Sequence, residues 1–212
     1  MAPRGAARLE IIQAAERLFA ERGIEAVSLR DVNSAAGQRN HSAAQYHFGD
    51  RAGLIAAVFE ARMSGINEHR HRLLADLDSS GVDDLPAVVE ALVAPLVEAL
   101  VSTPSWYGRF LARARWDTLA ADVLAEHPAA SSVRDVNRRL QRQLAEVPPD
   151  LRHARIEQLH TLLVGTVAGW EWARDRHERH LPSATLTADL TATGLAVLTA
   201  PLPEAVRRTA AP

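Results

Sequence analysis

The segment AAERLFAERGIEAVSLRDVNSAAG spans residues 14–37, and QYHFGDRAGLIAAVF follows it at residues 45–59. In the first segment apolar residues recur at intervals of three and four, which predicts one buried face of an amphipathic helix over about residues 6–22. Gly23 ends that helix, because glycine tolerates the left-handed conformation of a helix C-cap.

Two shorter helices follow. Ser28 with Asp31 three residues later is a near capping box, which begins a second helix. Gly37 breaks the chain, and a third helix ends at Phe48. Two short helices joined by a glycine-containing turn and braced by a preceding helix form a helix-turn-helix unit, whose last helix enters the major groove of DNA. From spacing alone, three short helices with a glycine turn are more often plain core packing than a DNA-binding unit.

The whole chain reads as all-α, because period-two alternation is nearly missing and Pro and Gly fall mostly between periodic segments. The helices predicted after the first lie at residues 29–36, 41–47, 51–77, 84–102, 104–116, 117–126, 131–146, 150–180 and 184–199. The helices become longer and more apolar after residue 50.

The order of residues in the first segment resembles the N-terminal domain of TetR-family transcriptional regulators. The matching features are Leu18-Phe19 ahead of Glu-Arg-Gly, a Ser-initiated second helix ending in Ala-Gly, and Tyr-His-Phe closing the third, over about residues 8–60. The resemblance implies a helix-turn-helix DNA-binding domain at residues 1–50. It also implies a larger helical ligand-binding and dimerisation domain at residues 51–212, with the helix near 51–77 connecting the two.

One feature departs from the family pattern. The stretch GQRNHSAAQYHF, residues 37–48, reaches its Phe one residue late and has Gln45 where an aromatic residue is common. We therefore expect a turn longer by one residue. This irregularity is the only support for a different interpretation, a helical dimerisation module that has lost DNA binding.

Residues at the start of a recognition helix lie deepest in the groove, where Arg pairs with guanine and Asn or Gln with adenine. The base-reading candidates are Arg39, Asn40, His41, Ser42 and Gln45. A competing interpretation is that Asn40 or Ser42 only caps the third helix.

The predicted phosphate contacts come from helix ends and from the family resemblance. The candidates are Ser28, Arg30, Tyr46, His47 and Arg51. Backbone amides at the start of the second helix favour phosphate, and the resemblance implies contacts by Tyr46, His47 and Arg51. Alternatively, the Tyr46 or His47 ring braces the first helix.

Paired half-sites one helical turn apart require two copies of the chain, so we expect a homodimer. Gly165 and Gly169 would allow close approach of helices, and the final helix has an apolar face. The full set of interface candidates is Gly165, Gly169, Leu190, Leu195 and Leu198, in a four-helix bundle with the partner. Packing of the glycines within one chain is the alternative.

The family resemblance implies a small-molecule pocket among the middle helices. The candidate lining residues are Trp106, Tyr107, Phe110, Trp116, His160 and Trp170. Most aromatic residues at helical spacing are ordinary core, and a histidine in the middle of a helix is more often a hydrogen-bonded core residue than a ligand contact.

Composition narrows the possible functions. Cysteine is absent, which excludes disulfides, Cys-ligated metals and Cys nucleophiles, and the net charge of −2 gives no sign of nucleic acid. His177 and His180 have chelating spacing but lie in a charged helix end, so we expect no metal and no cofactor. We find no apolar run long enough for a membrane span. Because residues 1–10 have no apolar core followed by a cleavage site, we expect no signal peptide and a cytoplasmic protein.

These observations predict a non-enzymatic, sequence-specific transcriptional regulator. By resemblance it is a repressor that a small-molecule effector of unknown identity releases from a palindromic operator in double-stranded DNA. The alternative is an all-helical small-molecule-binding protein or enzyme without DNA binding. An enzyme requires acids and bases clustered within the apolar helices, and the sequence has few.

Overall fold

A computed structural model describes residues 4–40, 42–81, 84–101, 105–202 and 204, and in these the chain is helical without strands. The elements are α1 (Arg4–Arg22), α2 (Leu29–Ala35), α3 (Ala43–Phe48), α4 (Arg51–Ser80), α5 (Leu85–Val101), α6 (Tyr107–Ala114), α7 (Thr118–Glu126), a 3₁₀ turn η1 (Pro128–Ala130), α8 (Ser131–Gln143), α9 (Pro149–Asp175) and α10 (Ser183–Thr199). The all-α prediction is confirmed, with each predicted helix present and boundaries shifted by a few residues.

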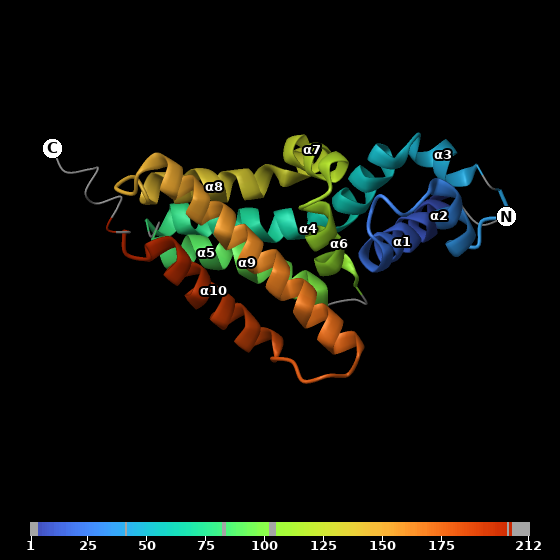
Figure 1. The fold of residues 1–212 in the computed structure, drawn as a ribbon. Helices are drawn as coiled ribbons and strands as arrows, with labels where there is room; N and C mark the ends of the chain where they lie inside the picture. Colours follow the sequence, from blue (N-terminus) through green and yellow to red (C-terminus); the bar gives the residue numbers. More distant parts are fainter. Residues whose placement is uncertain (1–3, 41, 82–83, 102–104, 203, 205–212) are drawn as a thin grey trace.

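The helices form two groups joined by α4. Figure 1 shows α1, α2 and α3 gathered at the N-terminal end, while α4 leaves them and runs into the larger group formed by α5 to α10. Within that group α5 packs against α4, α8 and α10, and α9 packs against α6 and α10. Helix α4 therefore contacts both the first three helices and the larger bundle.

Local side-chain caps begin α2 and α4. The Ser28 hydroxyl accepts a hydrogen bond from the Asp31 amide at 3.1 Å, and the Asp31 carboxylate accepts one from the Ser28 amide at 2.9 Å, which confirms the predicted capping box. The first turn of α4 is capped similarly, because Asp50 accepts from the Gly53 amide at 2.8 Å.

Gly53 is required by close packing of the backbone. Phe48 is the last residue of α3, and a Cβ atom at position 53 would lie 2.0 Å from its carbonyl oxygen. A side chain would force the start of α4 away from the end of α3. The direct connection between the third and fourth helices therefore depends on glycine at this position.

The predicted helix over residues 150–180 ends at Asp175. His177 takes the left-handed conformation with φ 55°, and the chain turns there before α10. Pro95 lies inside α5 without ending the helix, and it is buried there.

Candidate nucleic-acid interface and effector cavity

Asn33 fixes the angle between α2 and α3. Its side chain is buried, and its Oδ1 accepts a hydrogen bond from the Ala44 amide at 2.8 Å. That amide lies in the first turn of α3, where no intrahelical partner is available. A second tie holds the intervening turn, because Gln38 Nε2 donates to Glu10 Oε2 on α1 at 2.9 Å. The turn and α3 are thus fixed to both preceding helices.

The described base-reading candidates all lie on the surface. Arg39, Asn40, Ser42 and Gln45 are exposed, and His41 lies outside the described residues. Asn40 Oδ1 accepts from the Ser42 amide at 3.0 Å, so Asn40 takes part in the turn before α3. Ser42 occupies the N-cap position without a capping bond from its side chain. Ala43 and Ala44 are buried, so the opposite face of α3 packs on the core.

The predicted phosphate contacts differ in their surroundings. Tyr46 is 74% exposed, which leaves its ring on the surface instead of against α1. The His47 ring lies beside the Tyr46 and Phe48 rings, with centroids 5.3 and 5.9 Å away. Arg51 is partly exposed in the first turn of α4, and Arg30 is exposed on α2.

Ser28 is less available to a phosphate than its neighbours. Its amide and hydroxyl both bond to Asp31, and these bonds hold the pKa of that carboxyl below its usual value. An anion approaching Ser28 would meet an ionised carboxylate that already uses the amide. Contact at this end of α2 would therefore have to involve Arg30 or other amides.

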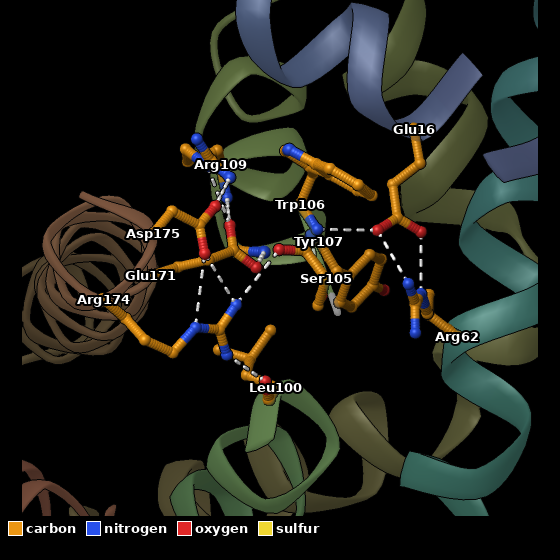
Figure 2. Close-up of polar contacts among 11 residues, drawn as sticks. Glu16, Arg62, Leu100, Ser105, Trp106, Tyr107, Arg109, Glu171, Arg174 and Asp175 are labelled. Atoms are coloured by element: carbon orange, nitrogen blue, oxygen red, sulfur yellow. Dashed lines mark hydrogen bonds and ion pairs between the residues drawn. The ribbon is translucent and has the colours of Figure 1, made fainter. Parts of the chain in front are cut away.

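The N-terminal end of α6 is held by two buried carboxylates (Figure 2). On one side, Glu16 of α1 is 2% exposed and accepts the Trp106 amide at 2.9 Å. The same carboxylate accepts two bonds from Arg62 of α4, at 2.7 and 2.9 Å. Glu16 thus joins the first helix, the connecting helix and α6 at a single point.

On the other side, Glu171 of α9 is fully buried and accepts the Arg109 amide at 3.0 Å and the Gly108 amide at 3.4 Å. Arg109 Nε also donates to it at 3.2 Å. Burial raises the pKa of Glu171, and the bonds from Arg109 oppose that rise. Figure 2 shows both carboxylates converging on the same turn of α6 from opposite helices.

A cavity of about 550 Å³ lies between α4, α5, α6, α7, α8 and α9. Its walls are mostly apolar side chains, with Arg70, Asn137 and His160 among the polar ones. His160 Nε2 is 2.8 Å from Asn137 Oδ1, and burial lowers the pKa of His160 to about 4. The His160 ring is therefore neutral at pH 7, and the cavity combines an apolar interior with a few fixed polar groups.

The predicted pocket residues separate into three groups. Trp116 and His160 line the 550 Å³ cavity, whereas Trp106 lines a hollow of about 680 Å³ between α1, α2 and α4. Tyr107 and Phe110 are fully buried, and their rings stack with centroids 5.9 Å apart. Trp170 is buried and donates to the Leu181 carbonyl at 2.7 Å. These last three rings line neither hollow and pack as core.

The predicted interface residues on α9 and α10 fall into exposed and buried ones. Gly165 and Gly169 are exposed, and a Cβ at either would meet open space, so neither packs closely within the chain. Leu195 is partly exposed. Leu190 and Leu198 are 2% and 0% exposed, so they hold α10 to its own chain, which corrects their assignment to a surface for a second copy. The exposed face of α10 instead has Ala188, Ala192 and Ala196.

Among the described residues, no group of three or more His, Asp or Glu side chains is arranged to hold a metal ion. In the same part of the chain, no helix is both long and apolar enough to span a membrane. His180, one of the two histidines considered for chelation, has its Nδ1 2.8 Å from the Glu178 carbonyl and packs edge-on against Trp170.

Residues 11–58 match the family model described as bacterial regulatory proteins, tetR family. No curated protein matches the chain. Among solved structures, NalD of Pseudomonas aeruginosa, the secondary repressor of the MexAB-OprM multidrug efflux pump, is 20% identical, with 94% of this chain and 100% of that chain covered and a TM-score of 0.60. FadR of Bacillus halodurans, a fatty acid degradation regulator, is 13% identical, with coverages of 91% and 98% and a TM-score of 0.60.

A TetR family transcription regulator of Marinobacter aquaeolei is 16% identical, with coverages of 90% and 95% and a TM-score of 0.59. At such identities the likeness shows the fold. Together with the family match over residues 11–58, it confirms the predicted resemblance of the N-terminal segment to the TetR family, and the described part of the chain has the fold of these regulators. This fold and domain support a DNA-binding regulator.

Proposed function

We propose, on the basis of its TetR-type N-terminal domain, that this chain is a homodimeric, sequence-specific repressor that a small-molecule effector releases from a palindromic operator. The observation that carries the proposal is the exposed polar face of α3 and the turn before it. Arg39 and Gln45 are exposed there while Ala43 and Ala44 pack inward. Such a helix can enter the major groove without disturbing the core beneath it.

The proposed division is a DNA-binding domain at residues 1–50 and an effector-binding and dimerisation domain at residues 51–212. Helix α4 packs against elements of both groups, which suits it to transmit a change from one to the other. Dimerisation would use the exposed small residues of α9 and α10, including Gly165, Gly169 and Ala192. Small side chains let two helices approach closely, and a four-helix interface would fix the spacing of the two α3 helices.

Effector binding would reach the DNA-binding domain through α6. Its C-terminal end borders the 550 Å³ cavity at Ala114 and Arg115, and its N-terminal end is held by Glu16 and Glu171. A ligand that displaces α6 must move the Trp106 amide against Glu16 of α1. The effector shifts the population of dimers only by its differential affinity for the two arrangements.

The test compares Gln45→Ala with Arg51→Ala by fluorescence anisotropy, on the duplex upstream of the chain's own gene and on random-sequence duplex. Arg51→Ala should weaken binding to both duplexes by a similar factor and reduce the salt slope by about 1, because its guanidinium would contact phosphate. Gln45→Ala should reduce the preference for the upstream duplex. Arg138→Ala serves as the control, because Arg138 is an exposed cation on α8.

The proposal of these roles fails if both variants weaken the two duplexes alike. The proposed function itself fails if the folded wild-type dimer binds neither duplex at low salt.

A further inference from the structure

Arg70 is a buried cation that bonds to no acidic side chain among the residues that the structure describes. It lies in the middle of α4, is 2% exposed and lines the 550 Å³ cavity. Its Nε and Nη2 donate to the Ala91 and Leu92 carbonyls, each at 3.0 Å, and its Nη1 donates to Ser132 Oγ at 3.0 Å. All three acceptors are uncharged, so these bonds leave the positive charge uncompensated.

Pro95 explains the position of the guanidinium but does not neutralise it. Proline has no N–H, so the Ala91 carbonyl four residues earlier loses its helical donor, and Arg70 Nε supplies one. Burial lowers the pKa of Arg70 to about 10, which still leaves it charged at pH 7. Carbonyl dipoles satisfy its hydrogens, yet burying a charge without an opposite charge remains costly.

The other charged groups around the cavity do not supply the missing anion. Glu157 is exposed and pairs with Arg115 at 2.8 Å, near the exposed Trp116. Arg134 is exposed and donates to the Ala125 and His127 carbonyls. Since the His160 ring is neutral at pH 7, the lining has three cations and one carboxylate, and that carboxylate is already paired.

We propose that the effector is an amphipathic organic anion, with an apolar body among Met63, Leu96 and Leu163 and a single carboxylate-like group directed to Arg70. This inference rests on the proposed effector-binding role of the second domain. A bound anion would supply the opposite charge that Arg70 lacks, and its attraction to this buried guanidinium would be screened less than an attraction between exposed charges. A cationic molecule of the same shape would be repelled by the same guanidinium.

The first experiment leaves the protein unchanged and varies the ligand head group. Decanoate, decanol and decylamine have the same apolar chain, and their binding to the full-length protein is measured by titration calorimetry below micellar concentrations. Decanoate should bind roughly tenfold or more tightly than decanol, and decylamine should bind more weakly than either. Equal binding of decanoate and decanol, tighter binding of decylamine, or binding of none of the three overturns the proposal.

The second experiment adds a carboxylate beside Arg70 inside the chain. Ser132→Asp places a carboxylate at the residue that Arg70 Nη1 contacts, in the first turn of α8, where a negative charge suits the helix dipole. Ser131→Asp adds the same charge one residue earlier, at a position whose side chain contacts His71. Ser132→Asp should weaken decanoate binding by roughly tenfold, and Ser131→Asp should change it by less than about twofold.

Equal weakening by the two variants would mean that net charge, not Arg70, governs binding, and would overturn the proposal. Circular dichroism checks that each variant folds, and if Ser132→Asp does not, the comparison of head groups in the unchanged protein decides. None of these measurements uses DNA. A failure of the anion proposal is therefore distinct from a failure of the repressor proposal, which would appear as absent DNA binding.

Discussion

The two ends of this molecule are held together by bonds of very different reach. In the first three helices and the start of α4, the Ser28–Asp31 and Asp50–Gly53 caps each join residues three apart, and Asn33 reaches Ala44 across eleven. At α6 the bonds reach much farther along the chain: the Trp106 amide bonds to Glu16 of α1, 90 residues away, and Arg109 bonds to Glu171 of α9, 62 residues away. The bonds within the helix-turn-helix unit therefore span at most the 28 residues between Gln38 and Glu10, whereas the buried carboxylates Glu16 and Glu171 join α6 to helices 62 or more residues away.

The difference in reach matches two different tasks: one region keeps a fixed surface, and the other transmits a change between distant helices. A helix-turn-helix unit must present the same surface whichever way the dimer is arranged, and local caps achieve that with little dependence on distant helices. A transmitting region must respond to distant events, and a carboxylate shared between helices changes several contacts when one helix moves. Breaking a distant bond should therefore affect the whole fold more than breaking a local one.

The largest effect is expected at Glu171. Glu171→Leu leaves two amides of the first turn of α6 and the Arg109 guanidinium without this acceptor, so it should lower the free energy of unfolding by about 3 to 4 kcal/mol in urea denaturation. Asp175→Asn removes the other, more exposed partner of Arg109 and should cost less than about 1 kcal/mol. Similar losses of unfolding free energy in the two variants would contradict the larger contribution assigned to the buried Glu171 carboxylate.

Substitutions of two glycines in α4 test the close packing between the start of this helix and the end of α3. Gly53→Ala should lower the unfolding free energy by about 2 to 3 kcal/mol, because the new Cβ would lie 2.0 Å from the Phe48 carbonyl oxygen. Gly65→Ala, in the same helix, meets open space and should raise it by about 0.5 to 1 kcal/mol. Both are measured by thermal unfolding, and effects of the same sign would contradict the packing described at the start of α4.

The effect expected from His160 appears only as the pH is lowered. Its pKa is about 4 in the folded chain and about 6.5 when unfolded, so the unfolded state binds more protons between these values. Its contribution to stability is complete above about pH 6.5 and is lost as the pH falls towards 4, by roughly 2 to 3 kcal/mol. His160→Gln should flatten this part of the stability profile, whereas His153→Gln, at an exposed position of α9, should not.

If the two variants keep the same slope between pH 6.5 and 4, the loss of stability on acidification arises elsewhere. The measurement is urea denaturation at a series of pH values, with the wild type and both variants treated alike.

The sequence predicts most of what depends on neighbours along the chain. Helical periodicity locates the ten α-helices of the described part of the chain, and the spacing of Ser28 and Asp31 predicts the capping box that the structure contains. The end of α9 was predicted too late, because nothing in the charged sequence before Pro182 marks the turn at His177. The sequence also identifies residues that the structure exposes on α3 and the turn before it, and their roles on DNA stay predictions.

The residues that hold distant helices together were not predicted. Glu16, Arg70 and Glu171 each occupy a position that continues an apolar i, i+4 stripe, as Glu171 does after Leu163 and Val167. A charged residue at such a position indicates a buried ion, and that pattern could have identified them. Their partners lie on other helices, so only the fold reveals which pairs form.

The same limit applies to the cavity and the proposed interface. Aromatic residues at helical spacing look alike in a sequence whether they line a cavity, as Trp116 does, or fill the core, as Phe110 does. Likewise Leu190 and Leu198 form an apolar face that the chain itself covers. Periodicity shows that a face is apolar, and it does not show what packs against that face.

The central claim is that α3 and the turn before it read DNA twice in each dimer. Selection of bound duplexes from a random-sequence pool by the full-length protein tests it most directly. The account predicts enrichment of a palindrome whose half-sites lie about one helical turn or a multiple of it apart, with Gln45→Ala altering the preferred base at one symmetric pair of positions. Enrichment of no sequence, or of a site without two-fold symmetry, by a folded dimer at low salt would contradict it.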